Sequence, residues 1–426
     1  MTLGRDRTPP SVVLVGAHGH GRGHLEHLAA RTAAGRVRLA GVADVRPLDE
    51  QQQALAGDSL FDTDAARVIA EVRPAIVVIS TPMHTHSNLA RLAFEAGAHV
   101  LLEKPPTPTM AEFDALLAAQ QAAGVACQIG FQAFGSRAYA ELANLVATGA
   151  LGEIRRIGLT GAWTRAASYY ARAAWAGRRS LDGVPVMDGA LTNPFAHGVA
   201  MAVRLDGSGG AEPVSQVEVD TYRAYPIEAD DTASVRITTA RGTTVTAAVT
   251  LCAETAREPI VEVVGSAGKA ELWYTEDRLR TADGECRFDR VDLLDNLLDH
   301  LADGVPLVAP LAETRSFMQV VEAIRVGPAA TEIEARFQRQ DGDRRIVPGV
   351  DDVVRQAVAA GALFSELPVA WATGKPFRWT ESDRERSAES VRERSTENDR
   401  ERSTDSNHVS QAGGRIEGQS GVNADE

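Results

Sequence analysis

With 426 residues, of which 44% are hydrophobic, the chain is long enough for two globular domains. Its formal net charge of −14 argues against a nucleic-acid backbone or an anionic membrane as the main partner. Three widely spaced cysteines, no visible signal peptide and no apolar run of membrane-spanning length predict a reduced, cytoplasmic protein, with no metal site and no membrane partner.

Residues 1–10 are expected to be a flexible N-terminus, and strand and helix signals alternate over residues 11–133. Short apolar runs predict strands near 11–16, 37–44, 75–81, 98–104 and 125–131. Helical spacing of apolar residues predicts helices near 24–32, 65–71, 87–96 and 109–123. Strands without polar alternation, separated by helices, indicate an α/β fold with a doubly wound parallel sheet, a Rossmann domain.

Residues 134–380 show longer, more alternating strand signals, near 154–160, 215–222, 234–239, 243–251, 260–264 and 269–273. Turns such as Ala240-Arg241-Gly242 between them predict hairpins and an antiparallel sheet. With helices expected near 291–302, 313–325 and 351–364, this part is predicted to be a C-terminal α+β domain.

Residues 381–426 contain the consecutive octads DRERSAES, VRERSTEN and DRERSTDS and no aromatic side chain. Such a segment has too little apolar surface to offset the entropy lost on ordering, so a disordered tail is predicted. Its role stays open between a solvated appendage and a partner-binding tail.

The segment GAHGHGRGH follows the first predicted strand and opens the first helix. Gly16 and Gly21 take the outer positions of a GxGxxG loop, while His18 stands where the middle glycine is expected and Gly19 follows it. Glycine lets the backbone approach a pyrophosphate, which the helix N-terminus attracts. A glycine-rich loop without a ligand is the alternative.

Asp44 ends the second predicted strand, where a carboxylate can accept hydrogen bonds from ribose hydroxyls. Arg46, two residues later, could instead meet a 2′-phosphate, so the cofactor is NAD or NADP. Asp44 as a simple turn residue is the alternative. His24 and His27 are expected to be helix-surface or packing residues.

Two further loops end strands at the carboxyl edge of the predicted sheet, where ligands bind in such folds. The third strand ends in TPMHTH, in which His86 could also cap the next helix, and the fourth ends in EKPP. A partly desolvated lysine can take up a hydroxyl proton or stabilise its oxygen. These loops predict cofactor contacts from Thr81, Pro82, His84, Glu103 and Lys104.

Together these segments resemble the glucose–fructose oxidoreductase / inositol dehydrogenase / MocA family over residues 11–375. The matching runs are VGAHGHGRGH, GVAD, VVISTPMHTHSNLARLAFEAGAHVLLEKP, QIGFQ, LVATGALGEIRRI and VEVVGSAGKAELW. The resemblance implies a Rossmann domain followed by an open, mostly antiparallel sheet that binds substrate and often makes homo-oligomer contacts. It also implies that Lys104 contacts substrate and cofactor and that Pro105 is often cis.

Members of the family usually carry an aspartate four residues before a catalytic histidine. Here Asn193-Pro194-Phe195-Ala196-His197 matches that spacing, with Asn193 in place of the aspartate, while Asp188 does not fit the spacing. An imidazole near neutral pKa suits a base for a substrate hydroxyl. His197 as a packing residue is the alternative.

The stretch WTRAASYYARAAWAGR concentrates aromatic and polar side chains in a chain with 5% aromatic residues. Such side chains suit the mixed faces of a sugar ring, although a docking arm or packed loop is as plausible an interpretation. Gln132, after the fifth strand, is expected near the nicotinamide. The substrate-binding candidates are Lys104, Trp163, Tyr170, Arg172, Trp175, Asn193 and His197.

The leading hypothesis is an NAD(P)-dependent dehydrogenase that transfers hydride between the cofactor and a secondary alcohol of a sugar or cyclic polyol. Lys104 and His197 would share the handling of the proton. One alternative is an NAD-assisted lyase or glycosidase that regenerates its cofactor in each cycle. The other is a non-catalytic dinucleotide-binding sensor.

Overall fold

A computed structural model describes residues 8–207 and 210–383 of the chain. The described residues up to Trp379 form one compact unit. The flexible N-terminus and the disordered tail predicted from the sequence lie almost wholly outside the described residues. Within these residues, no helix is long and apolar enough to cross a membrane.

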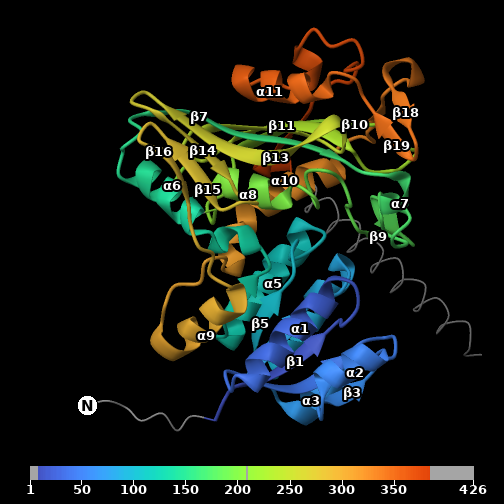
Figure 1. Ribbon diagram of the computed structural model, residues 1–426, viewed down its shortest axis with the longest axis vertical. Helices are drawn as coiled ribbons and strands as arrows, with labels where there is room; N and C mark the ends of the chain where they lie inside the picture. The colour runs from blue at the N-terminus through green and yellow to red at the C-terminus, as the bar shows by residue number, and fades with distance from the viewer. Residues whose placement is uncertain (1–7, 208–209, 384–426) are drawn as a thin grey trace, which may run out of the picture. The chain divides into compact units, whose positions relative to one another are not determined.

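The N-terminal part is built on a parallel sheet with strand order β3-β2-β1-β4-β5-β6 (Figure 1). This order reverses direction between β1 and β4, as in a doubly wound Rossmann fold, so the predicted fold is confirmed. In the described residues the strands are β1 (Ser11–Val15), β2 (Arg38–Ala43), β3 (Leu60–Asp62), β4 (Ile76–Ile79), β5 (His99–Leu102) and β6 (Cys127–Ile129).

Helices cover both faces of this sheet. Its central strands are almost wholly buried, which explains why they read as unbroken apolar runs. The helices and 3₁₀ turns of this part are α1 (His20–Ala33), α2 (Glu50–Ala56), α3 (Ala65–Val72), η1 (Met83–Thr85), α4 (His86–Glu95), α5 (Met110–Ala123) and η2 (Gln132–Gly135).

Among the described residues, the second sheet has ten strands, in the order β16-β15-β14-β13-β7-β12-β11-β10-β17, with β20 also paired to β10. The pairs β7–β12 and β10–β17 are parallel, whereas the β10–β11, β11–β12, β7–β13, β13–β14, β14–β15 and β15–β16 pairs are antiparallel, so the predicted open, mostly antiparallel sheet is confirmed. Its strands are β7 (Ile154–Thr164), β10 (Gln216–Arg223), β11 (Thr232–Thr238), β12 (Thr244–Thr250), β13 (Cys252–Gly265), β14 (Lys269–Trp273), β15 (Arg278–Thr281), β16 (Gly284–Arg287), β17 (Thr331–Glu332) and β20 (Phe377–Thr380).

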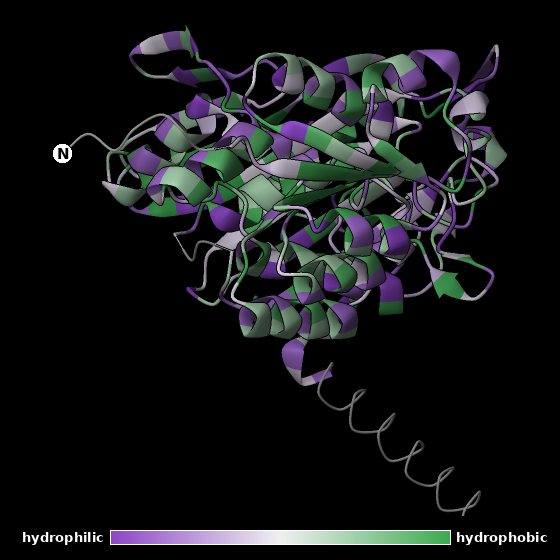
Figure 2. Ribbon diagram, turned by 90° about the horizontal axis from the view of Figure 1, so that it is seen from below, coloured by the Kyte–Doolittle hydropathy of each residue, from purple (hydrophilic) through white to green (hydrophobic). Residues whose placement is uncertain are grey.

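Helices lie on both sides of this large sheet, with α11 on one side and α8 and α10 on the other, facing the Rossmann part (Figure 1). The central strands are mostly hydrophobic, whereas the surrounding helices alternate hydrophobic and hydrophilic residues (Figure 2). The remaining elements are α6 (Arg137–Ala147), α7 (Ala167–Tyr170), β8 (Ser180–Leu181), β9 (Val184–Pro185), α8 (Ala196–Arg204), α9 (Leu293–Asp303), η3 (Leu311–Thr314), α10 (Arg315–Val326), η4 (Ala335–Phe337), β18 (Arg339–Asp341), β19 (Arg344–Ile346), α11 (Val350–Ala360) and η5 (Phe364–Glu366).

The helix α9 returns from the second sheet to the Rossmann sheet. Its Leu293, Leu294 and Leu297 join the apolar cluster formed by β1, β2 and α1. Arg31 of α1 forms ion pairs with Asp292 and Asp295 at 2.9 and 2.8 Å. A segment far beyond residue 133 therefore completes the apolar core of the Rossmann sheet. The domain boundary predicted between residues 133 and 134 stays a prediction.

The sequence interpretation missed several short elements. The strand β3 has three residues that are only partly buried or exposed, so it left no apolar run to detect. The helix α1 begins at His20, four residues before the predicted start, because the glycine-rich segment itself forms the first turn. The helices α2, α6 and α8 were also missed.

Candidate active site

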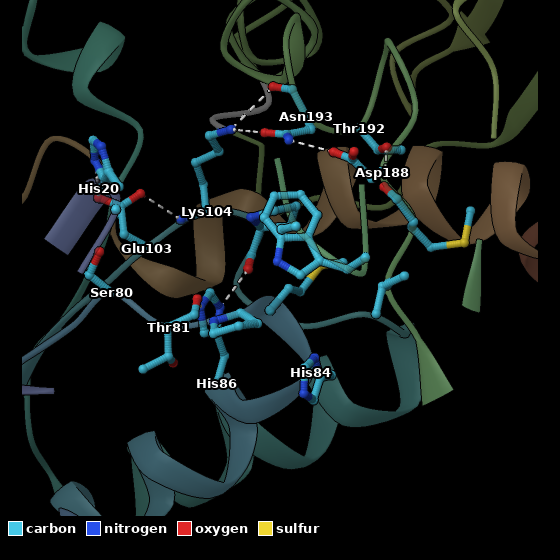
Figure 3. A pocket seen from close by; sticks show the side chains of 18 of the residues that line it. His20, Ser80, Thr81, His84, His86, Glu103, Lys104, Asp188, Thr192 and Asn193 are labelled. Carbon is cyan, nitrogen blue, oxygen red and sulfur yellow. Dashed lines mark hydrogen bonds and ion pairs between the residues drawn. The ribbon is translucent and has the colours of Figure 1, made fainter. Parts of the chain in front are cut away.

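A pocket of about 780 Å³ lies at the carboxyl edge of the Rossmann sheet and is closed by residues from the second part of the chain (Figure 3). The predicted site residues that line it are His18, Gly19, Arg46, Thr81, Pro82, His84, Glu103, Lys104, Gln132, Arg172, Trp175, Asn193 and His197.

The glycine loop fits a diphosphate. Gly16 has a φ of +87°, and a Cβ there would lie 2.3 Å from the Ser80 carbonyl oxygen. A Cβ on Gly21 would lie 1.9 Å from the Gly16 carbonyl oxygen, so only glycine allows the helix to start so close to the strand. The first turn of α1 carries no acidic residue, which leaves its positive end available to an anion.

Asp44 is held by the same loop. Its Oδ2 accepts hydrogen bonds from the backbone N–H of Ala17 at 2.8 Å and of His18 at 3.3 Å, and its Oδ1 accepts one from the N–H of Arg46 at 3.0 Å. Burial acts to raise the pKa of Asp44, but the hydrogen bonds from His18 and the backbone outweigh it and lower the pKa. Asp44 is therefore a fixed negative charge beneath the loop.

The His18 side chain, which replaces the middle glycine, turns toward this carboxylate. Its Nδ1 lies 3.0 Å from Asp44 Oδ2, and the side chain is 20% exposed on the pocket wall. Arg46 stays largely exposed, with its Nε 3.9 Å from Asp44. The imidazole thus packs beside the loop, where it is engaged with Asp44.

Glu103 is a buried residue, and three side chains contact one oxygen of its carboxylate, Oε1. His24 Nε2 lies at 2.9 Å, the Gln132 amide donates from 3.1 Å and His20 Nε2 lies at 3.2 Å. Burial acts to raise the pKa of Glu103, but the contacts with His20 and His24 prevail and hold the pKa far below its usual range. His24, expected to be a surface or packing residue, is instead a partner of Glu103.

His20, His24 and Glu103 bring their ligand atoms within 4.8 Å of one another, an arrangement that can hold a metal ion. Hydrogen bonding to one carboxylate oxygen already accounts for this closeness. The absence of a metal expected from the sequence stays a prediction.

Lys104 follows Glu103 and points away from it, toward the second part of the chain. Its Nζ donates to Asn193 Oδ1 at 2.7 Å and to the Asn193 carbonyl oxygen at 3.1 Å (Figure 3). The peptide bond between Lys104 and Pro105 is cis, as the resemblance implied. Burial lowers the pKa of Lys104, against the opposing charges of Glu103 and Asp188.

His197 reaches the same pocket from the first turn of α8. Its Nδ1 is buried and has no hydrogen-bond partner among the described residues, whereas the residue as a whole is only partly buried. Burial, together with the charge of Lys104, lowers its pKa to about 3. The imidazole is therefore neutral near pH 7, but its pKa lies far below the near-neutral value expected from the sequence, so by itself it accepts hydrogen bonds and is a weak base.

His86 joins the two loops that end β4 and β5. It is buried, with Nδ1 2.9 Å from the Pro105 carbonyl oxygen and Nε2 2.9 Å from the Thr81 carbonyl oxygen. Burial lowers its pKa. It is the first residue of α4, and its side chain ties the Thr81 loop to the Lys104 loop.

Two predicted substrate contacts do not reach the pocket. Trp163 packs against Phe195 with ring centroids 4.5 Å apart, because β7 places it over the core of the second sheet. Tyr170 packs on Tyr225 at 4.9 Å, and its hydroxyl group is buried. Arg172 does reach the wall, stacked on Trp175 at 4.6 Å.

Several lining residues were not anticipated as site residues. Six of them lie within segments that the sequence had singled out, next to the residues named there: His20, Ser80, Met83, His86, Pro105 and Ala173. The other four, Val186, Met187, Asp188 and Thr192, come from a stretch without a recognisable motif, which the tertiary fold brings to the pocket. Asp188 had been set aside because of its spacing from His197.

Comparisons with known proteins identify the family and the fold. Residues 11–131 match the model of the oxidoreductase family with an NAD-binding Rossmann fold, and residues 139–271 match the GFO/IDH/MocA C-terminal domain. Inositol 2-dehydrogenase 4 of Saccharopolyspora erythraea is 33% identical over 142 residues, which is 33% of this chain and 42% of that protein. Levoglucosan dehydrogenase of Pseudarthrobacter phenanthrenivorans is 27% identical over 39% of this chain and 47% of its own length.

The matches thus span less than half the length of these curated relatives. Among solved structures, the WlbA dehydrogenase of Bordetella pertussis, in complex with NADH and UDP-GlcNAcA, has a TM-score of 0.62 at 21% identity, over 74% of this chain and 95% of its own. An oxidoreductase of Thermotoga maritima has a TM-score of 0.63 at 15% identity, over 80% and 99% of the two chains. These two likenesses concern the fold. On the matches to both family models, the chain belongs to the GFO/IDH/MocA oxidoreductase family, with an NAD-binding Rossmann domain at its N-terminal end.

Proposed function

We propose that the protein is an NAD-dependent dehydrogenase that oxidises a secondary alcohol of a sugar or cyclic polyol, or catalyses the reverse reduction. One observation carries the proposal: Lys104 from the Rossmann part and His197 from the second part line the same pocket as the glycine loop. The names of two curated relatives, an inositol dehydrogenase and a levoglucosan dehydrogenase, favour this substrate class.

NAD is the proposed cofactor, because the Asp44 carboxylate lies just beneath the loop with a lowered pKa. A fixed negative charge there can accept hydrogen bonds from ribose hydroxyls and would repel a 2′-phosphate. When bound, the dinucleotide supplies the nicotinamide that takes or returns the hydride.

The chain's own residues would handle the proton. The Lys104 ammonium has three N–H groups, of which Asn193 accepts two, and the third is available to a substrate oxygen in the pocket. His197 is neutral, so it would accept a hydrogen bond from the substrate hydroxyl, and it would take the proton once bound substrate and cofactor raise its pKa from about 3 toward neutrality. A positive Lys104 would stabilise the negative charge that develops on that oxygen.

The wall around these groups suits a ring with polar and apolar faces. Trp175, Val186, Met187 and Ala173 supply apolar surface, while Lys104 and the second N–H of the Asn193 amide supply hydrogen-bonding groups. Aromatic and aliphatic walls with a few polar groups are typical of pockets for small cyclic ligands.

The test is a screen of inositols and hexoses with NAD, read by NADH absorbance. We expect Lys104→Met to lower kcat/KM by about 100-fold or more while NAD still binds, since proton handling contributes about this much. Lys375→Met, which changes an exposed lysine, is the matched control and should leave activity unchanged.

The outcomes separate the competing functions. Substrate turnover without net NADH would indicate the lyase or glycosidase chemistry. NAD binding without turnover of any compound would indicate a sensor, and absence of NAD binding by calorimetry would overturn both the dehydrogenase and the sensor.

A further inference from the structure

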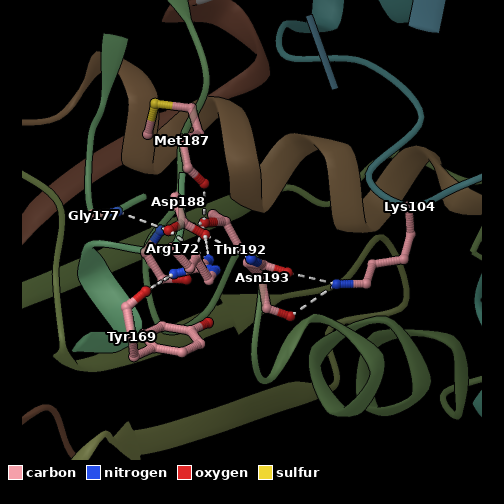
Figure 4. A network of polar contacts seen from close by, with 9 residues as sticks. Lys104, Tyr169, Arg172, Gly177, Met187, Asp188, Thr192 and Asn193 are labelled. Atoms are coloured by element: carbon pink, nitrogen blue, oxygen red, sulfur yellow. Dashed lines mark hydrogen bonds and ion pairs between the residues drawn. The ribbon is translucent and has the colours of Figure 1, made fainter. Parts of the chain in front are cut away.

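Asp188 is a buried carboxylate directly behind Asn193, and its side chain is 2% exposed. Its oxygens accept hydrogen bonds from Asn193 Nδ2 at 2.6 Å, from the Gly177 N–H at 2.7 Å and from Arg172 Nη2 at 2.9 and 3.1 Å. Figure 4 shows these groups in one network that continues from Asp188 through Asn193 to Lys104.

The two ends of this network admit only one orientation of the Asn193 amide. With Nδ2 facing Asp188, the amide oxygen faces the Lys104 ammonium at 2.7 Å. A flipped amide would set its N–H groups against the ammonium and its oxygen against the carboxylate, so that neither contact would be a hydrogen bond. Donation to a carboxylate also polarises the amide and strengthens its oxygen as an acceptor.

We propose that Asp188 is a positioning residue: acting through Asn193, it aims Lys104 into the pocket and supplies the negative charge that the asparagine lacks. The catalytic consequence of this positioning rests on the proposed function, whereas the positioning of Lys104 by Asp188 and Asn193 does not depend on it.

The turn that carries Asp188 and Asn193 is firmly held. Met187 has a φ of +43°, a strained conformation for a side chain of its size. Thr192 Oγ1 accepts a hydrogen bond from the Gly189 N–H at 2.9 Å and donates one to the Met187 carbonyl oxygen. Asp230, itself buried, accepts one from the Ala190 N–H at 2.9 Å. Backbone strain kept by so many contacts is typical of sites where a side chain must be held in place.

The charged groups that face Lys104 determine what can be measured. Burial lowers the Lys104 pKa, the charges of Glu103 and Asp188 raise it, and the charge of Arg172 lowers it. His197, on α8, is neutral near pH 7. Removing the Asp188 charge should therefore lower the Lys104 pKa further.

The chain permits a direct measurement, because lysine occurs in it only at positions 104, 269 and 375. Full-length protein labelled with ¹³C at lysine Cε gives three signals whose pH titration NMR follows without substrate or cofactor. We expect Asp188→Asn, which keeps the side-chain shape, to lower the Lys104 midpoint by about half a pH unit or more. The matched control is Asp182→Asn, which removes an exposed carboxylate from the same segment. It should leave the midpoint unchanged, and asparagine tolerates the positive φ of +50° at this position.

The route through Asn193 has its own test. Asn193→Ala should lower the Lys104 midpoint by itself, and it should reduce the further effect of Asp188→Asn to the part that the Asp188 charge exerts directly. Asn193→Asp should raise the midpoint above the wild-type value, including in the Asp188→Asn background.

Two results would overturn the proposal. One is a Lys104 midpoint that Asp188→Asn moves no more than Asp182→Asn does. The other is an equal shift in the Asn193→Ala background, which would mean that Asp188 acts on Lys104 through its charge alone and not through Asn193. If a substrate is found, Asp188→Asn should lower kcat about tenfold with unchanged NAD affinity. A screen that finds no substrate would count against the proposed function and leave the titration result intact.

Discussion

Glu103 shows how a single residue can be buried as an anion in this fold. Its side chain is 10% exposed, yet it has no lysine or arginine ion pair among the described residues. The contacts with His20, His24 and Gln132 at one oxygen replace the water that the carboxylate loses. The physical consequence is a charge that stabilises the folded state only while it stays ionised.

Replacing that charge gives a pH-dependent prediction. Because the folded pKa of Glu103 is lowered, its contribution to stability is present above the unfolded pKa of about 4.3 and is lost as the pH falls below it. We expect Glu103→Gln to lower the free energy of unfolding by about 1–3 kcal/mol at pH 7, and by less at pH 3. Urea unfolding at both pH values measures this, with the exposed Glu71→Gln as control. An equal loss at both values would contradict the prediction.

At the scale of elements, the segment that carries the site is tied to the end of α10 by Arg179. Its guanidinium donates to the carbonyl oxygens of Ile324 and Arg325 at 2.9 Å, of Gly327 at 2.8 Å and of Pro328 at 2.9 Å. The last carbonyl groups of a helix have no partner within it, and a cation there also meets the negative end of the helix dipole. One side chain thus caps the helix and holds the segment that leads to Asp188.

Removing this cap should weaken both elements. We expect Arg179→Ala to lower the free energy of unfolding by about 1–3 kcal/mol, since several carbonyl groups lose their donor. Arg179→Lys should recover only part of the loss, because an ammonium cannot span four carbonyl groups as the planar fork does. Thermal unfolding provides the measurement, with the exposed Arg178→Ala as control. Full recovery by lysine would mean that charge alone matters.

At the scale of the molecule, the Rossmann sheet depends on a distant part of the chain. The helix α9 adds three leucines to its core, and the Ile129 N–H donates to the Ala309 carbonyl oxygen at 2.8 Å. The predicted domain of residues 11–133 therefore lacks one layer of its own packing. The homo-oligomer implied by the resemblance remains a prediction.

This dependence can be tested with a fragment. Residues 8–133 alone should bind a hydrophobic dye and unfold at lower denaturant concentration than the full chain, because the α9 face of the sheet is uncovered. In the full chain, Leu297→Ala should lower the free energy of unfolding by about 2–4 kcal/mol. Glu95→Ala, a substitution at an exposed position of α4, is the control and should leave it nearly unchanged. A fragment as stable as the full chain would mean that α9 contributes little.

The sequence by itself determined the fold class, the strand–helix order of the Rossmann part and the segments that carry Lys104 and His197. These features are encoded locally, since burial on both sheet faces forces apolar runs and turns require particular residues. Short edge strands such as β3 were not predicted, because their side chains are too little buried to produce an apolar run in the sequence.

Only the tertiary structure decided which side chains meet. Glu103 lies 79 and 83 residues from His24 and His20, and Asn193 lies 89 residues from Lys104. No local spacing records such contacts, which explains why Asp188 was passed over and why Trp163, which packs against the core, was expected to bind a sugar. These contacts are determined by how the two sheets and their helices pack together, because a contact between distant residues depends on the packing of every element between them.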